Sequence, residues 1–592
     1  MRIACFPSGL YAFFVRFFAS LQIFFSILTD ILHALSTMKS YLTPILHDAL
    51  KTLSLTYGID APTEITLEVP RNVEHGDLST NVAMTLSKAL KKNPRELAVN
   101  LVEILKSSTN NTVITDISIA GAGFINFTFA PSFYGMRLQD LLLEGENIGR
   151  NERGRGIKAN VEYVSANPTG LLHVGHGRNA AIGDTLANIL TWNGYDVTRE
   201  YYFNNAGNQM NNLARSVHTR YLQIFDSTVD FSQDDKGLYH GEYIKEIAQT
   251  LASEHGKALV EANDDNLTIC RKAAEEWCFA TIRATMNRMN IHHDVYFNED
   301  SLYTDGKVKD TIDRLREKGF VYEKDGATWL ALSQMGMTDD RVIIKSSGEP
   351  TYRLPDIAYH HDKLARRKFD LVVDIFGADH IATIPDVMAA VEALGEEKSK
   401  VRVVIHQFVT LMKDGEQVKM SKRTGRSYTL DDLLEEFGED VTRFFFLMRG
   451  VSTHLEFDLN LAEEQSEKNP VFYLQYAHAR IASIMRTAEE RGVQIATTAD
   501  TTLLLHPSEI ELIKFVLRFP EVILRAADTL EPQVIAEYLR EVAAAFHKFY
   551  HDCRILGEEE SLMQARFALL RATKTVLNNG LAVLGIKAPE KM

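Results

Sequence analysis

The clearest change of hydrophobic pattern in the chain lies between residues 161 and 190. An apolar, β-branched stretch that begins at Val161 is typical of a buried parallel strand, and the Asn-Pro-Thr-Gly run at 167–170 breaks it. Apolar residues then recur at helical spacing, at Ile182, Leu186, Ile189 and Leu190. The turn between strand and helix therefore lies at the carboxyl end of a strand, where open α/β sheets bind ligands.

The same kind of pattern divides the rest of the chain. From Met38, an amphipathic helix, alternating strands and a second helix pair predict a compact α+β module over residues 38–130. Strand and helix patterns over 131–460 predict an α/β domain on a parallel sheet, with a largely helical insertion at about 204–326. Helical spacing dominates 461–592, which predicts an all-α bundle.

Residues 1–37 are apolar but do not fit this plan. Arg16 and Asp30 leave no uncharged run of the about 20 residues that a membrane-spanning helix needs. A signal peptide that ends near Ala34-Leu35-Ser36 is one alternative, and an organelle-targeting segment is another. We favour a third, in which Met38 is the natural start and residues 1–37 are an extra, non-native segment.

Composition narrows the class of protein. The 592 residues are enough for three or four domains, and a hydrophobic content of 45% suits a globular enzyme. With a net charge of -15, a nucleic-acid partner would have to meet local basic patches. The four cysteines show no Cys-x-x-Cys pairing, so we expect no zinc site, no disulfide framework and a reducing, cytoplasmic setting.

The turn after the first strand carries the sequence His173-Val174-Gly175-His176. A helix N-terminus attracts phosphate through its dipole and free N–H groups, and the glycine lets a nucleotide lie against the backbone. No Gly-Lys-Ser/Thr follows, so this is not a Walker loop. Taken alone, the two histidines could equally be a helix cap.

A second polar motif, Lys419-Met420-Ser421-Lys422, follows an apolar strand candidate at 403–411. Two flexible lysines beside a serine can neutralise a triphosphate as pyrophosphate leaves, although a solvated basic loop is the simpler interpretation of this motif alone. The two motifs together, in this order, resemble the paired HIGH and KMSK signatures of class I aminoacyl-tRNA synthetases.

Further blocks narrow the resemblance. Residues 74–84 read EHGDLSTNVAM, residues 121–127 read GAGFINF and residues 469–481 read NPVFYLQYAHARI. They resemble the arginyl-tRNA synthetases, which implies a Rossmann-like catalytic domain, an N-terminal domain that binds the tRNA elbow and a helical anticodon-binding domain. Asn205 replaces the aspartate of the family's NDAGNQ pattern, which leaves a charged role of that position open.

The substrate side chain sets the chemistry of the expected pocket. A guanidinium is a planar, five-donor fork, and a carboxylate beside an aromatic hydroxyl complements it. Tyr352 and Asp356, four residues apart, could present both from one helical turn, although Pro355 makes a regular helix uncertain. Singly, each carboxylate would more often be a structural ion pair.

The resemblance assigns roles to particular positions. Tyr352, Asp356 and Glu162 would hold the guanidinium, whereas Ser165, Asn167 and His173 would hold the amino-acid head group, and His380 stands where many relatives have glutamine. ATP would contact Gly175, His176, Gly377, Asp379, Lys419 and Lys422. The catalytic groups would be His173, His176, Lys419, Ser421 and Lys422, and the tRNA contacts Tyr473, Tyr476 and Arg480.

The implied reaction joins L-arginine to tRNA(Arg) through an arginyl-adenylate. ATP is the second substrate and would bind together with Mg²⁺, and no protein-bound metal is expected. We expect a cytoplasmic monomer that does not associate with membranes. Three rival classes stay open at this point: another HxGH nucleotidyl transferase, a non-catalytic RNA-binding paralogue, and a class I synthetase for a different amino acid.

Overall fold

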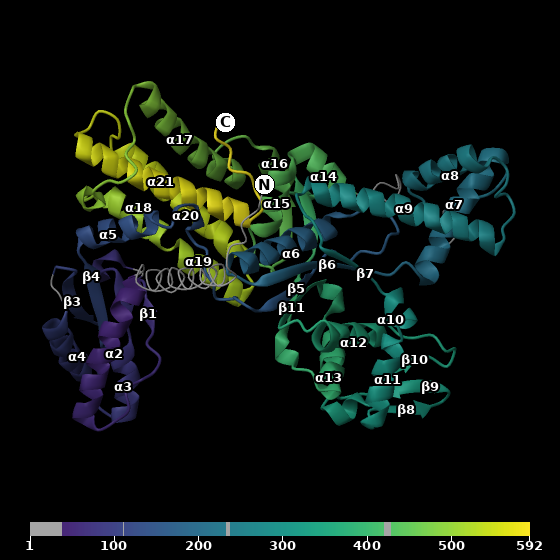
Figure 1. Cartoon of the computed structure of the whole chain (residues 1–592), viewed down its shortest axis with the longest axis horizontal. Coiled ribbons are helices and arrows are strands. Elements are labelled where there is room, and N and C mark those ends of the chain that lie inside the picture. The colour runs from purple at the N-terminus through teal and green to yellow at the C-terminus, as the bar shows by residue number, and fades with distance from the viewer. Residues whose placement is uncertain (1–37, 71, 110–111, 232–236, 419–427) are drawn as a thin grey trace, which may run out of the picture.

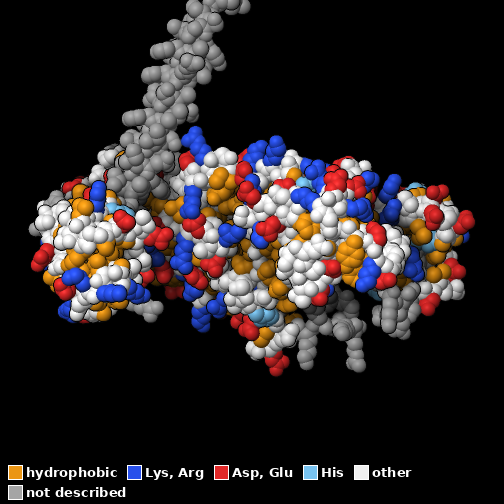
Figure 2. Space-filling view, turned by 90° about the horizontal axis from the view of Figure 1, so that it is seen from below, with side chains coloured by type: hydrophobic (Ala, Val, Ile, Leu, Met, Phe, Trp, Pro, Cys, Tyr) orange, Lys and Arg blue, Asp and Glu red, His pale blue; other side chains and the backbone are white. Residues whose placement is uncertain are grey.

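The computed structural model describes residues 38–592 except 71, 110–111, 232–236 and 419–427 (Figure 1). The prediction for residues 1–37 and those for Lys419, Ser421 and Lys422 lie outside the described residues. Within the described ranges, no helix combines the length and apolar character that crossing a membrane requires. Basic and acidic side chains are interspersed over the face that Figure 2 shows.

A five-stranded parallel sheet forms the centre of the molecule, in the order β12-β11-β5-β6-β7. Its strands are β5 (Lys158–Glu162), β6 (Asp196–Phe203), β7 (Val295–Asn298), β11 (Leu371–Gly377) and β12 (Val401–His406). The predicted strand 403–411 is in fact two, because β12 ends at His406 and β13 (Val409–Lys413) belongs to another sheet. All five strands run the same way, so their carboxyl ends share one edge.

Helix α6 (Val174–Trp192) follows β5 and lies against the sheet (Figure 1). It is almost wholly buried because α15 (Glu439–Leu447), α19 (Phe519–Thr529) and α21 (Glu560–Val583) pack on it as well. Gly183 lets it approach the sheet, since a Cβ there would lie 2.2 Å from Cβ of Tyr163.

The segment between β6 and β7 is helical and has its own apolar core. It comprises α7 (Gly207–Phe225), α8 (Glu242–His255) and α9 (Asp264–Arg288), which extend to one side of the sheet in Figure 1. The predicted insertion at 204–326 includes β7, which pairs with β6 and therefore belongs to the parallel sheet. Residue pattern alone did not identify this four-residue strand.

A smaller lobe lies between β7 and β11. Helices α10 (Asp300–Thr304) and α11 (Lys307–Glu317) precede an antiparallel sheet in the order β10-β9-β8. Its strands are β8 (Val321–Lys324), β9 (Ala327–Leu330) and β10 (Arg341–Ile344). Helix α12 (Arg353–His361), the π-helical turn Asp362–Arg366 and α13 (Ile384–Leu394) share a second core with this lobe.

The N-terminal module combines helices with an antiparallel sheet in the order β1-β2-β4-β3. Its elements are α2 (Met38–Tyr57), β1 (Leu67–Glu68), β2 (Leu78–Thr80), α3 (Val82–Leu90), α4 (Pro94–Ser108), β3 (Ile114–Ala120), β4 (Phe124–Phe129) and α5 (Pro131–Leu142). Helix α4 begins as the Asn93-Pro94 pair predicts, with the Asn93 side chain accepting from the backbone N–H of Arg95.

The carboxyl-terminal part is a helical bundle, joined to the sheet by a short mixed segment. The bundle comprises α17 (Pro470–Glu490), α18 (Pro507–Leu517), α19, α20 (Gln533–Asp552) and α21. The joining segment contains β13, β14 (Glu416–Gln417), α14 (Leu430–Phe437), α15, β15 (Leu455–Asp458) and α16 (Leu459–Glu463). Helix α18 packs on α5, so the bundle also contacts the N-terminal module.

Candidate active site

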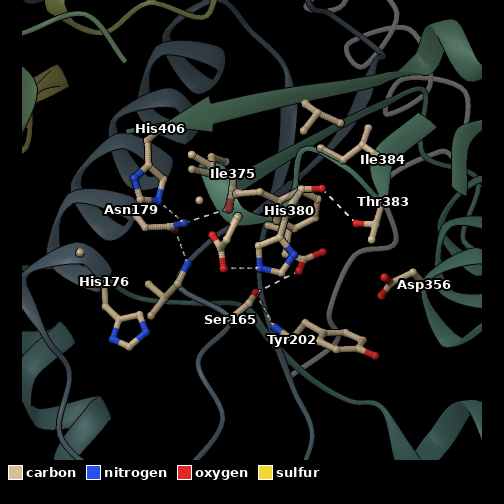
Figure 3. Close-up of a pocket in the computed structure, with 18 of the residues that line it drawn as sticks. Ser165, His176, Asn179, Tyr202, Asp356, Ile375, His380, Thr383, Ile384 and His406 are labelled. Atoms are coloured by element: carbon tan, nitrogen blue, oxygen red, sulfur yellow. Dashed lines mark hydrogen bonds and ion pairs between the residues drawn. The ribbon is translucent and has the colours of Figure 1, made fainter. Parts of the chain in front are cut away.

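A cavity of about 770 Å³ opens at the carboxyl edge of the parallel sheet (Figure 3). Every described residue that the sequence predicts to touch arginine or ATP lines it: Glu162, Ser165, Asn167, His173, Gly175, His176, Tyr352, Asp356, Gly377, Asp379 and His380. Figure 3 shows His176 and Asp356 on opposite sides of this space. The fold therefore joins residues that are as much as 218 positions apart in sequence, from Glu162 to His380.

The chain leaves β5 through a left-handed turn. Val164 and Ser165 have φ angles of 68° and 43°, a region that a β-branched residue enters only at a cost of about 1–3 kcal/mol. The backbone N–H of Val164 donates to Oδ1 of Asn179 at 2.6 Å, which helps to hold this turn. The strand thus ends at Glu162. Ser165 and Asn167 lie beyond it, so the alternation of side chains along a strand does not set their directions.

Both polar side chains of that turn have partners. The Ser165 hydroxyl donates to Oε1 of Glu162 at 3.0 Å and accepts from the backbone N–H of Tyr202 at 3.2 Å. The Asn167 amide accepts from the backbone N–H of Asn204 at 3.0 Å. These bonds tie the end of β5 to the end of β6, so the turn is fixed before any substrate binds.

His173 is the N-cap of α6, and its ring stacks on that of His176. Nδ1 of His173 accepts from the backbone N–H groups of Gly175 and His176, and Nδ1 of His176 accepts from that of His173 at 3.3 Å. These bonds leave Nε2 of each neutral ring to carry the proton. Burial lowers the pKa of both, that of His176 to about 3, with His173 and His406 also contributing to the shift of His176.

A glycine is required at position 175 for a steric reason, in addition to the predicted close approach of a nucleotide to the backbone. A Cβ at this position would lie 2.9 Å from Cε1 of His173, so a larger residue would disturb the stacked pair. The helix-cap interpretation and the ligand interpretation of these histidines are therefore both compatible with the structure, because capping is what orients the rings toward the cavity.

Asp356 lies in the first turn of α12, and Pro355 is accommodated there because early helix positions need no N–H donor. Its carboxylate forms no ion pair and accepts no hydrogen bond among the described residues, and burial raises its pKa to about 7. Tyr352 precedes the helix and is 82% exposed. The cavity thus contains a carboxylate that lacks a cation and, on an exposed side chain, an aromatic hydroxyl.

Sequence patterns missed two more residues on this side. Glu299, just after β7, accepts from the Tyr202 hydroxyl at 2.7 Å, and burial raises the pKa of this carboxyl group. Both line the cavity. The signal was a short strand that ends in Asn298-Glu299, but it was hidden because that range was assigned to a helical insertion.

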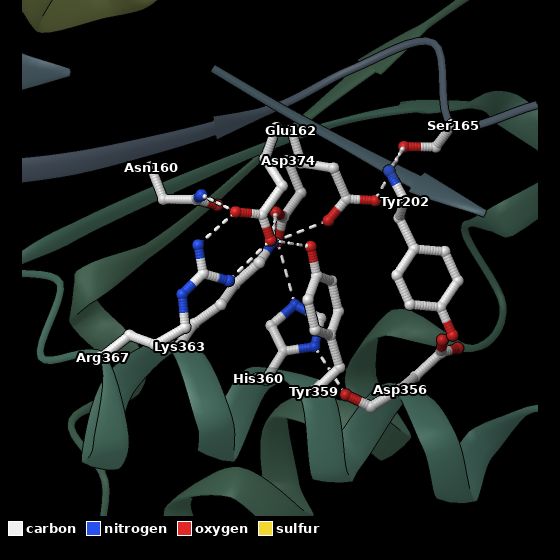
Figure 4. Close-up of polar contacts among 11 residues, drawn as sticks. Asn160, Glu162, Ser165, Tyr202, Asp356, Tyr359, His360, Lys363, Arg367 and Asp374 are labelled. Carbon is white, nitrogen blue, oxygen red and sulfur yellow. Dashed lines mark hydrogen bonds and ion pairs between the residues drawn. The ribbon is translucent and has the colours of Figure 1, made fainter. Parts of the chain in front are cut away.

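A row of acidic residues crosses the sheet beneath the cavity. Asp374, Glu162 and Glu200 are register partners on β11, β5 and β6. Nζ of the fully buried Lys363 lies 2.6 Å from Glu162 and 2.8 Å from Asp374 (Figure 4), while Arg367 pairs with Glu200. Neither cation could be predicted from the sequence, because nothing in a polar helical stretch marks which lysine or arginine turns inward.

The other end of the cavity is built on α6, β11 and β12. The Asn179 amide donates to the Ile375 carbonyl at 2.9 Å and lies 3.2 Å from Nε2 of His406. The buried Arg178 donates to the carbonyls of Gln407, Gly450 and Thr453. This arginine joins the helix of the histidine pair to the chain that leads into β13 and β15.

Comparisons with known proteins fit this arrangement. Residues 40–129 match the model "Arginyl tRNA synthetase N terminal domain", 137–445 match "tRNA synthetases class I (R), catalytic domain", and 474–592 match "DALR anticodon binding domain". An arginine–tRNA ligase of Salinibacter ruber is 50% identical over 573 residues, which covers 94% of this chain and all of that protein. The chain belongs to the arginine–tRNA ligase family. The predicted family is thereby confirmed.

Other members of the arginine–tRNA ligase family agree. The enzyme of Chlorobaculum tepidum is 48% identical over 563 residues, covering 94% of this chain and all of that one. The Thermus thermophilus arginyl-tRNA synthetase structure superposes with a TM-score of 0.72 at 21% identity, over 94% of this chain and all of that chain. The predicted class I fold, with its N-terminal domain and carboxyl-terminal helical domain, is confirmed.

The residues predicted to contact tRNA lie on α17, and two of them, Tyr476 and Arg480, fall within the match to the DALR anticodon binding domain. The Arg480 guanidinium donates to the Tyr476 hydroxyl at 2.6 Å and lies 4.8 Å from the centre of the Tyr550 ring. Tyr473 is partly buried, with its ring 5.0 Å from that of His547. Tyr476, Arg480 and Tyr550 therefore form a mixed aromatic and basic group, whereas Tyr473 is more of a packing residue.

Proposed function

We propose that the protein ligates L-arginine to tRNA(Arg), consuming ATP and releasing AMP and pyrophosphate. The observation that carries the proposal is one cavity with a stacked pair of neutral imidazole donors at one side and an unpaired carboxylate, Asp356, at the other. A phosphate ester suits the first and a guanidinium the second. Membership of the arginine–tRNA ligase family supports the same assignment.

In the first step the carboxylate oxygen of arginine attacks the α-phosphorus of ATP. The new O–P bond forms as the bond to the β-phosphate oxygen breaks, which gives arginyl-adenylate and pyrophosphate. No covalent enzyme intermediate is needed, so positioning and charge stabilisation account for the catalysis. His173 and His176 would donate through Nε2 to the phosphate oxygens as charge develops there.

In the second step a hydroxyl of the terminal ribose of tRNA attacks the carbonyl carbon of the adenylate, and AMP leaves. Tyr476 and Arg480 would hold the anticodon loop by stacking and phosphate contact, far from the chemistry. Tyr473 contributes to this surface mainly by packing against His547.

The amino acid would be held from both ends. Asp356 and Tyr352 would face its guanidinium, with Glu162 and Glu299 beside them in the cavity lining and His380 at the rim. Ser165, Asn167 and His173 would hold the amino and carboxylate groups. Uncompensated charge at Asp356 favours arginine over neutral amino acids, because binding restores an ion pair that the empty pocket lacks.

ATP would lie along Gly175, His176, Gly377 and Asp379, and Lys419, Ser421 and Lys422 would follow the leaving pyrophosphate. Mg²⁺ would arrive with ATP: among the described residues no cluster of three His, Cys, Asp or Glu side chains could hold a metal ion, and Mg²⁺ commonly keeps few protein ligands and several phosphate oxygens. Asp379 is an exposed carboxylate in the cavity lining that could contact this Mg²⁺ ion.

The protein would work as a cytoplasmic monomer. Light scattering after size exclusion, at two protein concentrations and without tRNA, measures whether the protein is a monomer. A mass of one chain, 66.8 kDa for the full sequence, is the expected result, and twice that mass contradicts it.

The deciding experiment is ATP–pyrophosphate exchange with each of the twenty amino acids, with and without bulk tRNA. We expect exchange with arginine alone, and only when tRNA is present, as the family resemblance implies. Exchange with another amino acid would contradict the pocket assignment. A folded chain without any exchange would point to a non-catalytic RNA-binding protein.

A further inference from the structure

Three carboxylates in one buried row pose an electrostatic problem. Asp374, Glu162 and Glu200 occupy neighbouring register positions, and parallel partners point to the same side of a sheet. Like charges this close and this dry normally force one group to take up a proton. Here cations remove the conflict: Arg367 serves Glu200, and Lys363 bridges Glu162 and Asp374.

The side chain of Lys363 is fully buried, and Figure 4 shows it among Glu162, Asp374, Tyr359 and His360. Its ammonium group also lies 4.2 Å from the centre of the Tyr359 ring, and Asp374 is held on its other oxygen by His360 at 2.9 Å. Burial alone would lower the pKa of Lys363, but Asp374 and Glu162 outweigh it and raise the pKa above its ordinary value. Lys363 is therefore permanently charged.

Glu162 links that buried cation to the cavity. One oxygen accepts from Nζ of Lys363 at 2.6 Å and the other accepts from the Ser165 hydroxyl at 3.0 Å. The Ser165 hydroxyl has a single proton, and it uses this proton in the hydrogen bond to Glu162. Its Oγ atom can therefore only accept further hydrogen bonds, and one lone pair already accepts from the Tyr202 N–H. The remaining lone pair makes Ser165 an acceptor, which suits an ammonium group.

We propose that Lys363 is a positioning residue for the amino-acid end of the pocket: through Glu162 it orients the Ser165 hydroxyl to accept from the α-ammonium group of arginine. This inference rests on the proposed function. It also explains the strained turn, since the Glu162–Ser165 bond holds a backbone with φ of 43° at Ser165. Glu162 then serves the head group through Ser165, beside any direct effect on the guanidinium.

A double-variant cycle tests whether Lys363 acts on the pocket through Glu162 or only forms a structural ion pair with it. Lys363→Met should raise the KM for arginine about 10- to 100-fold, the loss expected when a hydrogen bond to a charged group is broken, with the KM for ATP changed less than twofold. Glu162→Gln should raise it similarly, because its single amide oxygen cannot accept from both Lys363 and Ser165.

The decisive variant combines Glu162→Gln with Lys363→Met. If Lys363 acts through Glu162, the double variant has an arginine KM no higher than that of Glu162→Gln alone. A further rise of tenfold or more would overturn the proposal. The double variant removes the cation together with one of its anions, so it also serves as the comparison if Lys363→Met by itself does not fold.

Lys307→Met is the matched control. Lys307 on α11 lies 3.3 Å from the buried Asp362, which belongs to the same π-helical turn as Lys363, and Lys307 itself does not line the cavity. It should lower the unfolding temperature and leave the arginine KM within twofold. Wild-type protein is assayed first: absence of arginine exchange there would reject the proposed function, whereas an additive cycle in an active enzyme would reject only this inference.

Discussion

The rings of His173 and His176 stack with their centres 3.7 Å apart and an angle of 19° between their planes. Two imidazolium ions would repel each other at this distance, and the lowered pKa of each ring keeps both neutral at pH 7. The pair therefore acts by directed N–H donation and not as a charge, which bears on how activity should respond to pH and mutation.

Replacing His176 with Ala should lower kcat for adenylate formation about 100-fold, with the arginine KM little changed, because the contact strengthens as the phosphate gains charge. The pKa of His176 is about 3, so His176 does not titrate between pH 6 and pH 8 and should cause no loss of activity over that range. ATP–pyrophosphate exchange across that range measures both. A kcat that falls as pH rises through 6.5, and loses that step in the variant, would contradict neutral donation.

Asp356 should make arginine binding depend on pH. Its pKa is about 7 in the empty pocket, and only the ionised form attracts a guanidinium, so the arginine KM should fall as pH rises from 6 to 8. The steepest change is about tenfold per pH unit, below the pKa. Asp356→Asn should raise the KM about 100-fold and flatten the profile, because the titrating carboxyl group is removed. An unchanged profile in the variant would exclude Asp356 as the titrating group.

Lys422→Ala should lower the rate of adenylate formation more than it weakens ATP binding, because its charge is needed most as pyrophosphate leaves. Lys422 lies outside the described residues, so this expectation rests on the sequence motif. Single-turnover rates and ATP titrations, compared between variant and wild type, measure the two effects separately. Equal losses in both would count against a transition-state role.

Arg480→Met should raise the KM for tRNA about tenfold, as expected when one stacking and phosphate contact is lost. At saturating tRNA the KM values for arginine and ATP should not change, because α17 lies outside the cavity. Arg486→Met, on the same helix but bound to the Glu590 carbonyl, is the control and should leave the tRNA KM within twofold. Equal effects of the two substitutions would locate the contact elsewhere.

Much of the site follows from local sequence. The His173-Val174-Gly175-His176 motif predicted a strand-to-helix turn, and capping by His173 is a local interaction between residues at most three apart. Tyr352 and Asp356 lie at a helical spacing, so their proximity also needed no tertiary information. Each such feature depends on dihedral angles and hydrogen bonds within a few residues, which sequence constrains directly.

Other features could not be predicted, because they depend on contacts between residues far apart in the sequence. The four residues of β7 form a strand only because β6 offers a pairing edge, and this obscured Glu299. The left-handed turn at Val164 contradicts the residue's own preference and is held by Asn179, fifteen positions away. No local pattern contains that information.

By itself, the sequence determined the family, the order of domains, the two signature motifs and the chemical types that an arginine pocket requires, because these depend on residue identity and short-range spacing. Tertiary structure alone decided which charges remain unpaired. Glu162 and Asp356 are both pocket carboxylates, yet Lys363 neutralises one across 201 positions and leaves the other without a cation. Charge balance in a buried site depends on distance in space and on desolvation, and both are set only when the sheet brings its strands together.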